Sequence, residues 1–469
     1  MLTQNSDKGF IKYMMRLALP IALQNLLMAA FQLIDSAMVS RLGNAAMAGV
    51  SMAGRWSFIM MITLFGINSG ASILYSQYKG VNDQAGIRRV YGLAVTSSMA
   101  LVMLCGLVMA IFPSELVRVF AGRGAGSDDI VREGAAFMRI IAFNTIVLGF
   151  NYATTFMLRS TEEVRVPLVT SLIAVTINTG LNLVLIYGNL GMPPMGVRGA
   201  AVSTLVSSAV QALLLIVILR KRRHYVFTHM RELFSFTKPL VAKFYNIASP
   251  VFVNELLWSL GTSAYMFVFG RVGGVNGVPA YSLYSSVDQL LFSFVIGIAS
   301  ACGVMIGKAV GAGDTERAWR EAEKFLLLGT LFALAMGGLE ILLRVPLINL
   351  IQPEDPATGE LAKQLLLIGG FVLPMRMLSM LLIVAIFRSG GKPALGAAID
   401  VGCIWLVGVP VVAIAGFMFH LPFLWLFACI YTEEIIKVCL GLYYFFKKQW
   451  MRKLTEDKPL EAELPAETG

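Results

Sequence analysis

Acidic side chains interrupt several stretches of this chain that are otherwise apolar. Asp35, Glu255, Asp288 and Asp400 are the clearest, and one basic residue, Arg376, shares their setting. A charge near the centre of a bilayer costs several kcal/mol unless it faces a cavity or a partner. A carboxylate in such a place can bind a proton, a metal cation or an organic cation. These residues therefore indicate cation chemistry inside a membrane.

Polar residues share a helix face with two of these acids. Gln32 and Ser36 lie within about 40° of Asn25 at about 100° per residue, and Asp35 stands beside them. A second stripe consists of Glu255, Ser259 and Thr262. Two such stripes, each with one carboxylate, are typical of the walls of a central cavity. The alternative, which stays open here, is that the acids only anchor helices by pairing with Arg55, Arg139 or Arg376.

The two stripes lie in segments that repeat one pattern. Residues 20–43 read PIALQNLLMAAFQLIDSAMVSRLG, and residues 250–273 read PVFVNELLWSLGTSAYMFVFGRVG. The alignment has no gap, and its offset of 230 residues sets Asn25 against Glu255. A shared offset of this kind over most of a chain is typical of an internal duplication. The sequence therefore predicts two related lobes.

Composition places both lobes in a bilayer. Hydrophobic residues make up 57% of the chain and charged residues only 14%, which excludes an ordinary soluble domain. Twelve stretches, the first near 14–38 and the last near 421–446, approach the ~20 residues that a spanning helix needs. We therefore predict an all-α polytopic membrane protein, with twelve transmembrane helices in two pseudo-symmetric six-helix bundles.

Four regions follow from this division. The N-lobe covers 1–219, a basic linker 220–239, the C-lobe 240–447 and a tail 448–469. The tail is rich in Glu and Pro, so we expect it to be disordered. Because the basic residues follow alternate loops, the positive-inside rule predicts that the linker and both termini are cytoplasmic. The net charge of +10 then reflects topology in the plasma membrane and not nucleic-acid binding.

Other chemistries find little support in the sequence. The five cysteines fall inside predicted spans without metal-ligand spacing, so buried thiols are expected. Only three histidines occur, and neither a nucleophile motif within the spans nor a phosphate-binding G-x-x-x-x-G-K-[ST] loop is present. The sequence therefore argues against an enzyme or an ATP-driven pump, and no organic cofactor is expected.

Longer motifs resemble one transporter family. They are the first-span pattern from Pro20 through Asp35 to Arg41-Leu42-Gly43, the stretch INTGLNLVLIYGNLGMPPMGVRGAAVST at 177–204, the turn at 388–391, and Asp400 with Trp405 and Pro410. Over nearly its whole length the chain resembles a multidrug and toxic compound extrusion (MATE) transporter. The resemblance implies two six-helix bundles around a central V-shaped cavity. It also implies that organic, cationic drugs or toxic compounds leave in exchange for protons or sodium ions.

The resemblance also implies roles for particular residues. In the N-lobe, Asp35 matches an acid that takes part in cation coupling, and Asn178 and Thr204 match its polar partners. Asn182 stands where many members have Asp, which removes one carboxylate from this site. The same four residues could bind sodium, because a hard cation needs several oxygens. In the C-lobe, Glu255 and Asp400 are the corresponding candidates for cation coupling.

A substrate cavity would be lined by residues from both stripes and from the eighth span. These are Asn25, Gln32, Ser259, Thr262, Tyr265, Asp288 and Gln289. A monomer would suffice, since a doubled chain can form its own pathway. The alternative function is a flippase for a lipid-linked saccharide, which shares this architecture. Such a cargo needs more basic residues in the lumen than Arg55, Arg139 and Arg376.

Overall fold

Helices form all the elements that the computed structural model describes, within residues 7–121, 127–228, 233–351 and 355–455. The N-lobe comprises α1 (Asp7–Ser40), α2 (Asn44–Gly80), α3 (Gln84–Ile111), α4 (Pro113–Ala121), α5 (Ser127–Ser160), α6 (Arg165–Leu185), η1 (Asn189–Gly191) and α7 (Val197–Lys221). The C-lobe comprises α9 (Lys238–Val272), α10 (Gly274–Gly311), α11 (Thr315–Ile351), α12 (Pro356–Ser379), the π-helix η3 (Met380–Phe387), α13 (Pro393–Cys403), the π-helix η4 (Ile404–Gly408), α14 (Val409–Phe417), α15 (Phe423–Ile430) and α16 (Thr432–Phe446).

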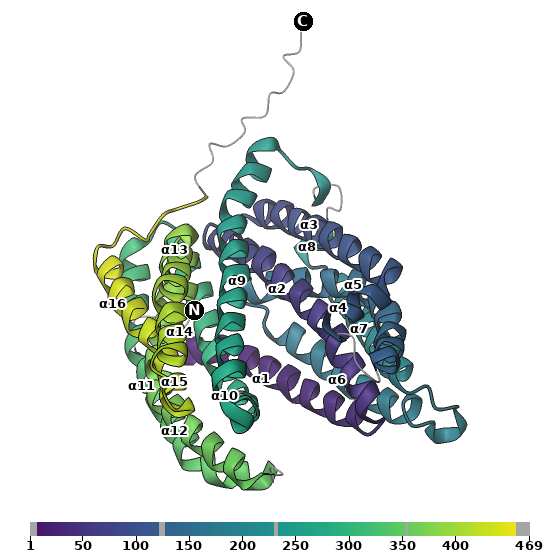
Figure 1. Ribbon diagram of the computed structural model, residues 1–469. Helices are drawn as coiled ribbons and strands as arrows, with labels where there is room; N and C mark the ends of the chain where they lie inside the picture. Colours follow the sequence, from purple (N-terminus) through teal and green to yellow (C-terminus); the bar gives the residue numbers. More distant parts are fainter. Residues whose placement is uncertain (1–6, 122–126, 229–232, 352–354, 456–469) are drawn as a thin grey trace, which may run out of the picture.

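These helices account for the predicted spans. Ten helical segments of the described chain are long and apolar enough to cross a membrane. The seventh predicted span is α9, and the twelfth is formed by α15 and α16, which meet at Tyr431. Figure 1 shows α1 to α7 gathered on one side of the molecule and α9 to α16 on the other. The predicted all-α architecture of two six-helix bundles is confirmed.

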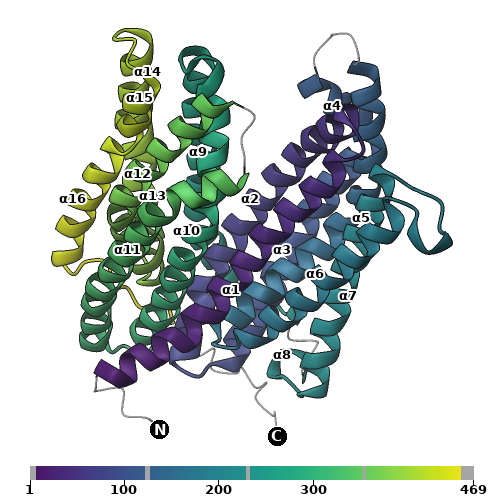
Figure 2. The ribbon, with the colours of Figure 1, turned by 90° about the horizontal axis from the view of Figure 1, so that it is seen from below.

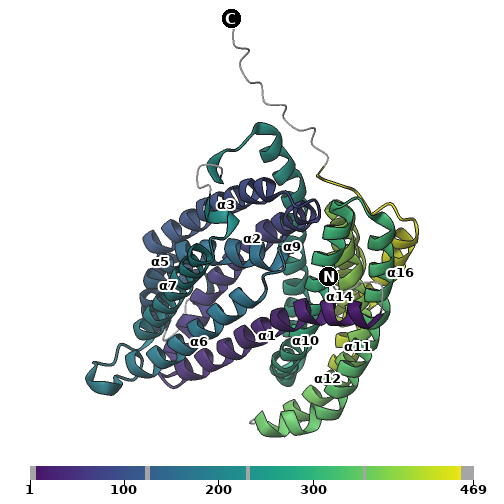
Figure 3. The ribbon, with the colours of Figure 1, turned by 180° about the vertical axis from the view of Figure 1, so that it is seen from behind.

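The two bundles form a V. Figure 2 shows them together at the end where α1 begins and apart at the opposite end. In Figure 3, α1 runs from the N-lobe across to α10 of the C-lobe, and these two helices pack against each other. The other main contacts between lobes join α2 to α9 and α10. We call the end where the bundles meet the closed end.

Close backbone contacts join the lobes at the closed end. A Cβ atom added at Gly70 of α2 would lie 2.5 Å from Ala248 Cα of α9. One added at Gly311 of α10 would lie 2.2 Å from the carbonyl oxygen of Gln77. Only glycine permits helices to approach this closely, because any side chain would meet the backbone of the other lobe.

Replacing Gly311 with Ala is therefore expected to force the lobes apart at the closed end. Overpacking of a tight contact costs about 1–3 kcal/mol, so thermal unfolding in detergent should begin at a clearly lower temperature. Gly402 of α13 is a matched control, because an added Cβ there would meet nothing within 4 Å. Equal unfolding temperatures for Gly311→Ala and Gly402→Ala would contradict this interpretation of the contact.

The first residues of the predicted tail pack onto the closed end. Trp450 is fully buried. The backbone of Leu454 donates to Gln77 Oε1 at 2.7 Å, and Gln77 Nε2 donates to the carbonyl of Arg452 at 3.2 Å. The prediction of disorder is therefore wrong for residues 448–455. Burial of the Trp450 indole and the hydrogen bonds to the Gln77 amide hold this part of the backbone in place. We call residues 450–455 the tail strap; residues 456–469 lie outside the described part of the chain.

The predicted linker contains the short helix α8 (Tyr225–Thr228) between α7 and α9. Its start is fixed by His224, whose Nε2 lies 2.7 Å from Glu163 Oε1 in the α5–α6 connection. The hydrogen bond with His224 is the main cause that lowers the pKa of Glu163. Lys79 and Arg222 lower it further through their charges.

Low pH should weaken the contact between Glu163 and His224. A carboxyl with a lowered folded-state pKa contributes stability above its unfolded-state pKa, and that stability is lost as the pH falls through the folded-state value. The Glu163 side chain is 32% exposed, so the loss should be about 1 kcal/mol or less. Thermal unfolding below pH 5 should therefore fall more steeply for the natural protein than for Glu163→Gln. Parallel pH profiles would argue against this contribution.

Candidate functional site

Asp35 ends a chain of polar side chains inside the N-lobe. Asn182 Nδ2 donates to Asp35 Oδ1 at 2.7 Å and to Asn178 Oδ1 at 2.9 Å. Asn178 Nδ2 donates in turn to Thr204 Oγ1 at 3.4 Å and to Ser207 Oγ at 3.3 Å. The two asparagines are four residues apart on α6 and so share one face, which lies between α1 and α7. The structure thus brings the four predicted N-lobe residues together and adds Ser207.

The charge of Asp35 is not balanced by any basic side chain in the described ranges, unlike the charges of the three other candidate acids. Asn182 is fully buried, and its Oδ1 has no hydrogen-bond partner among described groups. A buried polar atom left without a partner costs about 1–3 kcal/mol. One carboxylate with amide and hydroxyl oxygens suits a hard cation such as sodium, and a proton could instead reside on Asp35. The residues present therefore fit a monovalent cation.

Asp400 belongs to a different cluster, inside the C-lobe. Lys437 Nζ of α16 lies 2.8 Å from Asp400 Oδ1, 3.1 Å from Glu433 Oε1 and 3.7 Å from Glu434 Oε1. Tyr265 donates to Glu433 Oε2 at 2.8 Å. Lys437 is only 2% exposed, so its ammonium draws three carboxylates together in the interior of the lobe. Asp400 is thus an ion-paired residue.

Glu255 is paired separately. Its Oε1 lies 2.8 Å from Arg388 Nη2, and the Arg388 side chain is 3% exposed. Arg388 Nη1 also donates to Ser69 Oγ of α2 at 3.4 Å. The pair therefore connects the C-lobe to the N-lobe, and Glu255 does not share a site with Asp400.

Asp288 forms the third ion pair. Its two carboxylate oxygens accept from Arg376 Nη1 at 2.7 Å and from Arg376 Nη2 at 3.1 Å. The guanidinium also lies 4.4 Å from the centre of the Phe292 ring. Asp288 is 8% exposed. Of the three arginines considered as anchoring partners, Arg376 takes that role, whereas Arg55 and Arg139 are exposed.

The predicted cavity residues divide into two groups. Gln32 and Gln289 are exposed, and Asn25, Ser259 and Thr262 are half-buried. Asn25 Oδ1 accepts from Arg159 Nη2 at 3.3 Å. The sequence predicted that Tyr265 and Asp288 line the cavity, but both side chains are buried inside the C-lobe. The physical reason is that each has a charged partner inside the lobe, Glu433 for Tyr265 and Arg376 for Asp288.

Sequence reasoning missed the groups that surround these acids. Glu433, Glu434 and Lys437 lie within the last predicted span, and Glu340 lies within the ninth. The spacing of Glu433 and Lys437, four residues apart on one helix, was the signal that could have revealed the cluster, because such pairs face each other.

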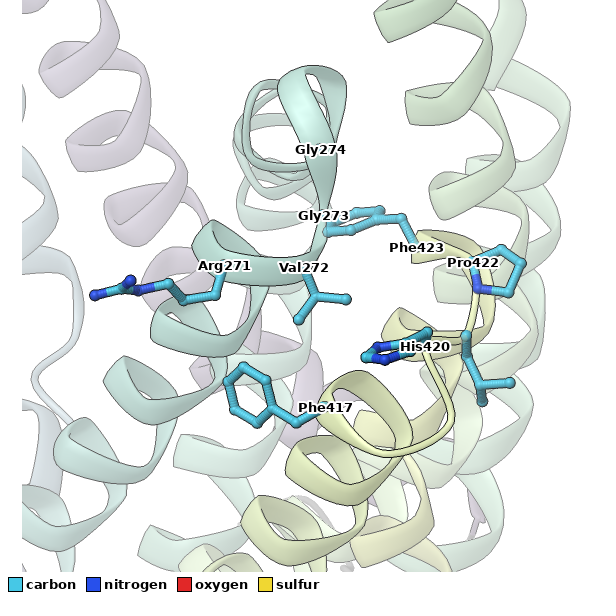
Figure 4. Close-up of a pocket in the computed structure, with 9 residues that line it drawn as sticks. Arg271, Val272, Gly273, Gly274, Phe417, His420, Pro422 and Phe423 are labelled. Carbon is cyan, nitrogen blue, oxygen red and sulfur yellow. The ribbon is translucent and has the colours of Figure 1, made fainter.

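A hollow at the far end of the C-lobe lies apart from these clusters. Its volume is about 590 Å³, and its lining consists of residues 271–274, Phe417 and residues 420–423. Figure 4 shows that these residues come from the junction of α9 and α10, from the end of α14 and from the connection that leads into α15. None of the predicted site residues lines it.

Known proteins of similar sequence have names that refer to multidrug resistance. The chain is 25% identical over 463 residues to the probable multidrug resistance protein YoeA of Bacillus subtilis, and the match covers 97% of each chain. It is 24% identical over 465 residues to the probable multidrug resistance protein NorM of Thermotoga maritima, with 96% of each chain covered.

A solved structure has the same fold. A crystal structure of MATE in the bent conformation superimposes with a TM-score of 0.82 at 20% identity, over 94% of this chain and 96% of that one. The family model described as MatE matches residues 20–184 and 250–414, two ranges of equal length that begin at the predicted repeat. The chain therefore belongs to the MatE family.

Proposed function

We propose that the protein is a secondary active efflux transporter that exchanges organic cations, such as drugs or toxic compounds, for protons or sodium ions by alternating access. As a MatE protein it is a multi-pass membrane transporter and not an enzyme. The names of its relatives, which refer to multidrug resistance, support small organic molecules as substrates. We place it in the plasma membrane as a monomer with both termini in the cytoplasm.

The observation that carries this proposal is the unbalanced charge of Asp35. A carboxylate that, among the described residues, is held by the Asn182 amide alone can take up one cation without first breaking an ion pair. Competition between the driving ion and an organic cation for that carboxylate would couple their movements. If the driving ion is sodium, we assign its ligands to Asp35, Asn178, Asn182 and Thr204; if it is a proton, Asp35 carries it. No other cofactor is proposed.

The shape of the molecule supports alternating access. The bundles are joined at the closed end and separate at the other (Figure 2). With cytoplasmic termini, this arrangement corresponds to an outward-facing state. Rocking of two related bundles about their interface would open the opposite side.

The flippase alternative gains no support from the basic side chains. A pyrophosphate cargo needs unpaired arginines facing the lumen. Arg376 is instead bound through two hydrogen bonds to Asp288, and Arg388 is paired with Glu255.

Reconstitution in liposomes tests the proposal directly. Tetraphenylphosphonium, a lipophilic cation, is followed while a sodium gradient or a pH gradient of equal size is imposed. Movement driven by one gradient alone would support exchange and identify the driving ion. Lack of movement under either gradient would overturn the proposal and make a fluorescent lipid-linked saccharide the next cargo to test.

A further inference from the structure

Glu340 of α11 is the most isolated acidic side chain in the described chain. The residue is fully buried, at 0% exposure. Neither Oε1 nor Oε2 has a hydrogen-bond partner among the described groups. An ionised carboxylate in such surroundings would lack both water and donors, which is among the most costly arrangements in a protein interior. A neutral carboxylic acid is the less costly form of Glu340 in such surroundings.

Titratable groups from α10, α12 and the α15–α16 connection surround this acid. Glu340 Oε1 and the Tyr284 hydroxyl approach the same position, lying 3.0 Å and 3.1 Å from where a Cβ of Gly369 would stand. The Tyr284 hydroxyl lies 3.0 Å from the hydroxyl of Tyr431 and accepts from Arg376 Nη1 at 3.4 Å. Arg376 thus contacts Tyr284, whose hydroxyl lies on the same side of Gly369 as Glu340 Oε1.

Arg376 does not neutralise Glu340 in this arrangement, because its charge is already balanced. Both of its Nη atoms bind the two oxygens of Asp288. Asp288 and Arg376 are also the two charged groups that act electrostatically on Glu340. One guanidinium therefore lies near two carboxyl groups: it binds that of Asp288 and does not bind that of Glu340.

We propose that Glu340 is a proton-binding residue of the C-lobe and that it releases its proton when Arg376 exchanges Asp288 for Glu340. A cation that binds Asp288 frees the guanidinium. Arg376 then pairs with Glu340, whose O–H bond breaks, and the proton leaves to water. One positive charge enters the lobe as one leaves, so the exchange is electroneutral. The mechanism rests on the proposed transport of organic cations.

Infrared spectroscopy of the purified protein tests the protonation step. At neutral pH, the natural protein should show the carbonyl band of a buried carboxylic acid that Glu340→Gln lacks. Glu316→Gln is the matched control on the same helix, because the Glu316 side chain is 81% exposed, and it should keep the band. Spectra in which Glu340→Gln and the natural protein have identical carboxylic-acid bands would overturn the proposal, since Glu340 would then be ionised.

Addition of tetraphenylphosphonium tests the exchange. The Glu340 band should disappear, and unbuffered protein should release about one proton for each cation bound, since one ion pair replaces another. A band that persists unchanged when the cation binds would show a permanently neutral structural acid and would overturn the proposal. These measurements report cation binding, whereas the gradient assay reports transport. A failure of the Glu340 proposal can therefore be distinguished from a failure of the proposed transport function.

A paired variant checks the part played by Arg376. Asp288→Asn with Arg376→Gln removes both charges of the pair and leaves no buried charge unpaired. Glu340 should then stay protonated, and tetraphenylphosphonium should release no proton. Proton release of natural size from this variant would exclude Arg376 as the exchanging group.

Discussion

Replacing Asp35 with Asn should strongly reduce efflux driven by an ion gradient while the protein stays folded. The amide can keep a hydrogen bond with Asn182 but has no charge to attract a cation. Two unit charges 4 Å apart near a protein surface attract by about 4 kcal/mol, and 1.4 kcal/mol corresponds to about a tenfold change in affinity. Coupled transport of tetraphenylphosphonium in liposomes should therefore fall at least about tenfold.

A surface acid separates the role of Asp35 from a general effect of charge. Asp129, at the start of α5, has a side chain that is 59% exposed, so Asp129→Asn should transport normally. Thermal unfolding of both variants should match that of the natural protein. Natural rates and unchanged ion dependence in Asp35→Asn would remove the observation on which the proposed mechanism rests.

Replacing Lys437 with Met should strongly destabilise the C-lobe. Three carboxylates, on Asp400, Glu433 and Glu434, lie within 3.7 Å of its ammonium, and the residue is almost fully buried. Removing one partner from a buried ion pair typically costs about 3–5 kcal/mol, because the remaining charge is uncompensated. The yield of folded protein and its unfolding temperature in detergent should both drop sharply.

Two further variants make this result specific. Lys447→Met, at an exposed position just after α16, should unfold like the natural protein. Adding Asp400→Asn to Lys437→Met removes the carboxylate nearest the lysine and should recover part of the lost stability. If Lys437→Met unfolded no earlier than Lys447→Met, the cluster would contribute nothing to the stability of the lobe.

The overall fold could be predicted because local sequence properties determine it. Long apolar stretches give spanning helices, and the repeat at 20–43 and 250–273 gives two similar bundles. The tail strap was missed because its order depends on a distant partner. Gln77 lies more than 300 residues before Leu454, and composition alone cannot reveal such a bond.

The N-lobe site could be anticipated in the same way. Asn178 and Asn182 face the same direction because they are one helical turn apart, and the resemblance to a family supplied Asp35 and Thr204. In the C-lobe the acids were found, and Arg376 was one of the partners considered, but Arg388 and Lys437 were not anticipated as partners. Glu255, Asp288 and Asp400 each pair with a basic residue from another helix, and these pairings depend on how the helices pack.

The position of the tail strap has a consequence for biosynthesis. The ribosome adds its residues, 450–455, only after both bundles, whereas Gln77 and Gly311, which the strap binds, are made much earlier. Chains emerge and fold from the N-terminus onward, so both bundles are synthesised before the strap can join them. A reporter fused after residue 447 in place of the residues that follow would therefore mature without this connection between the lobes, whereas one fused after residue 469 would retain it.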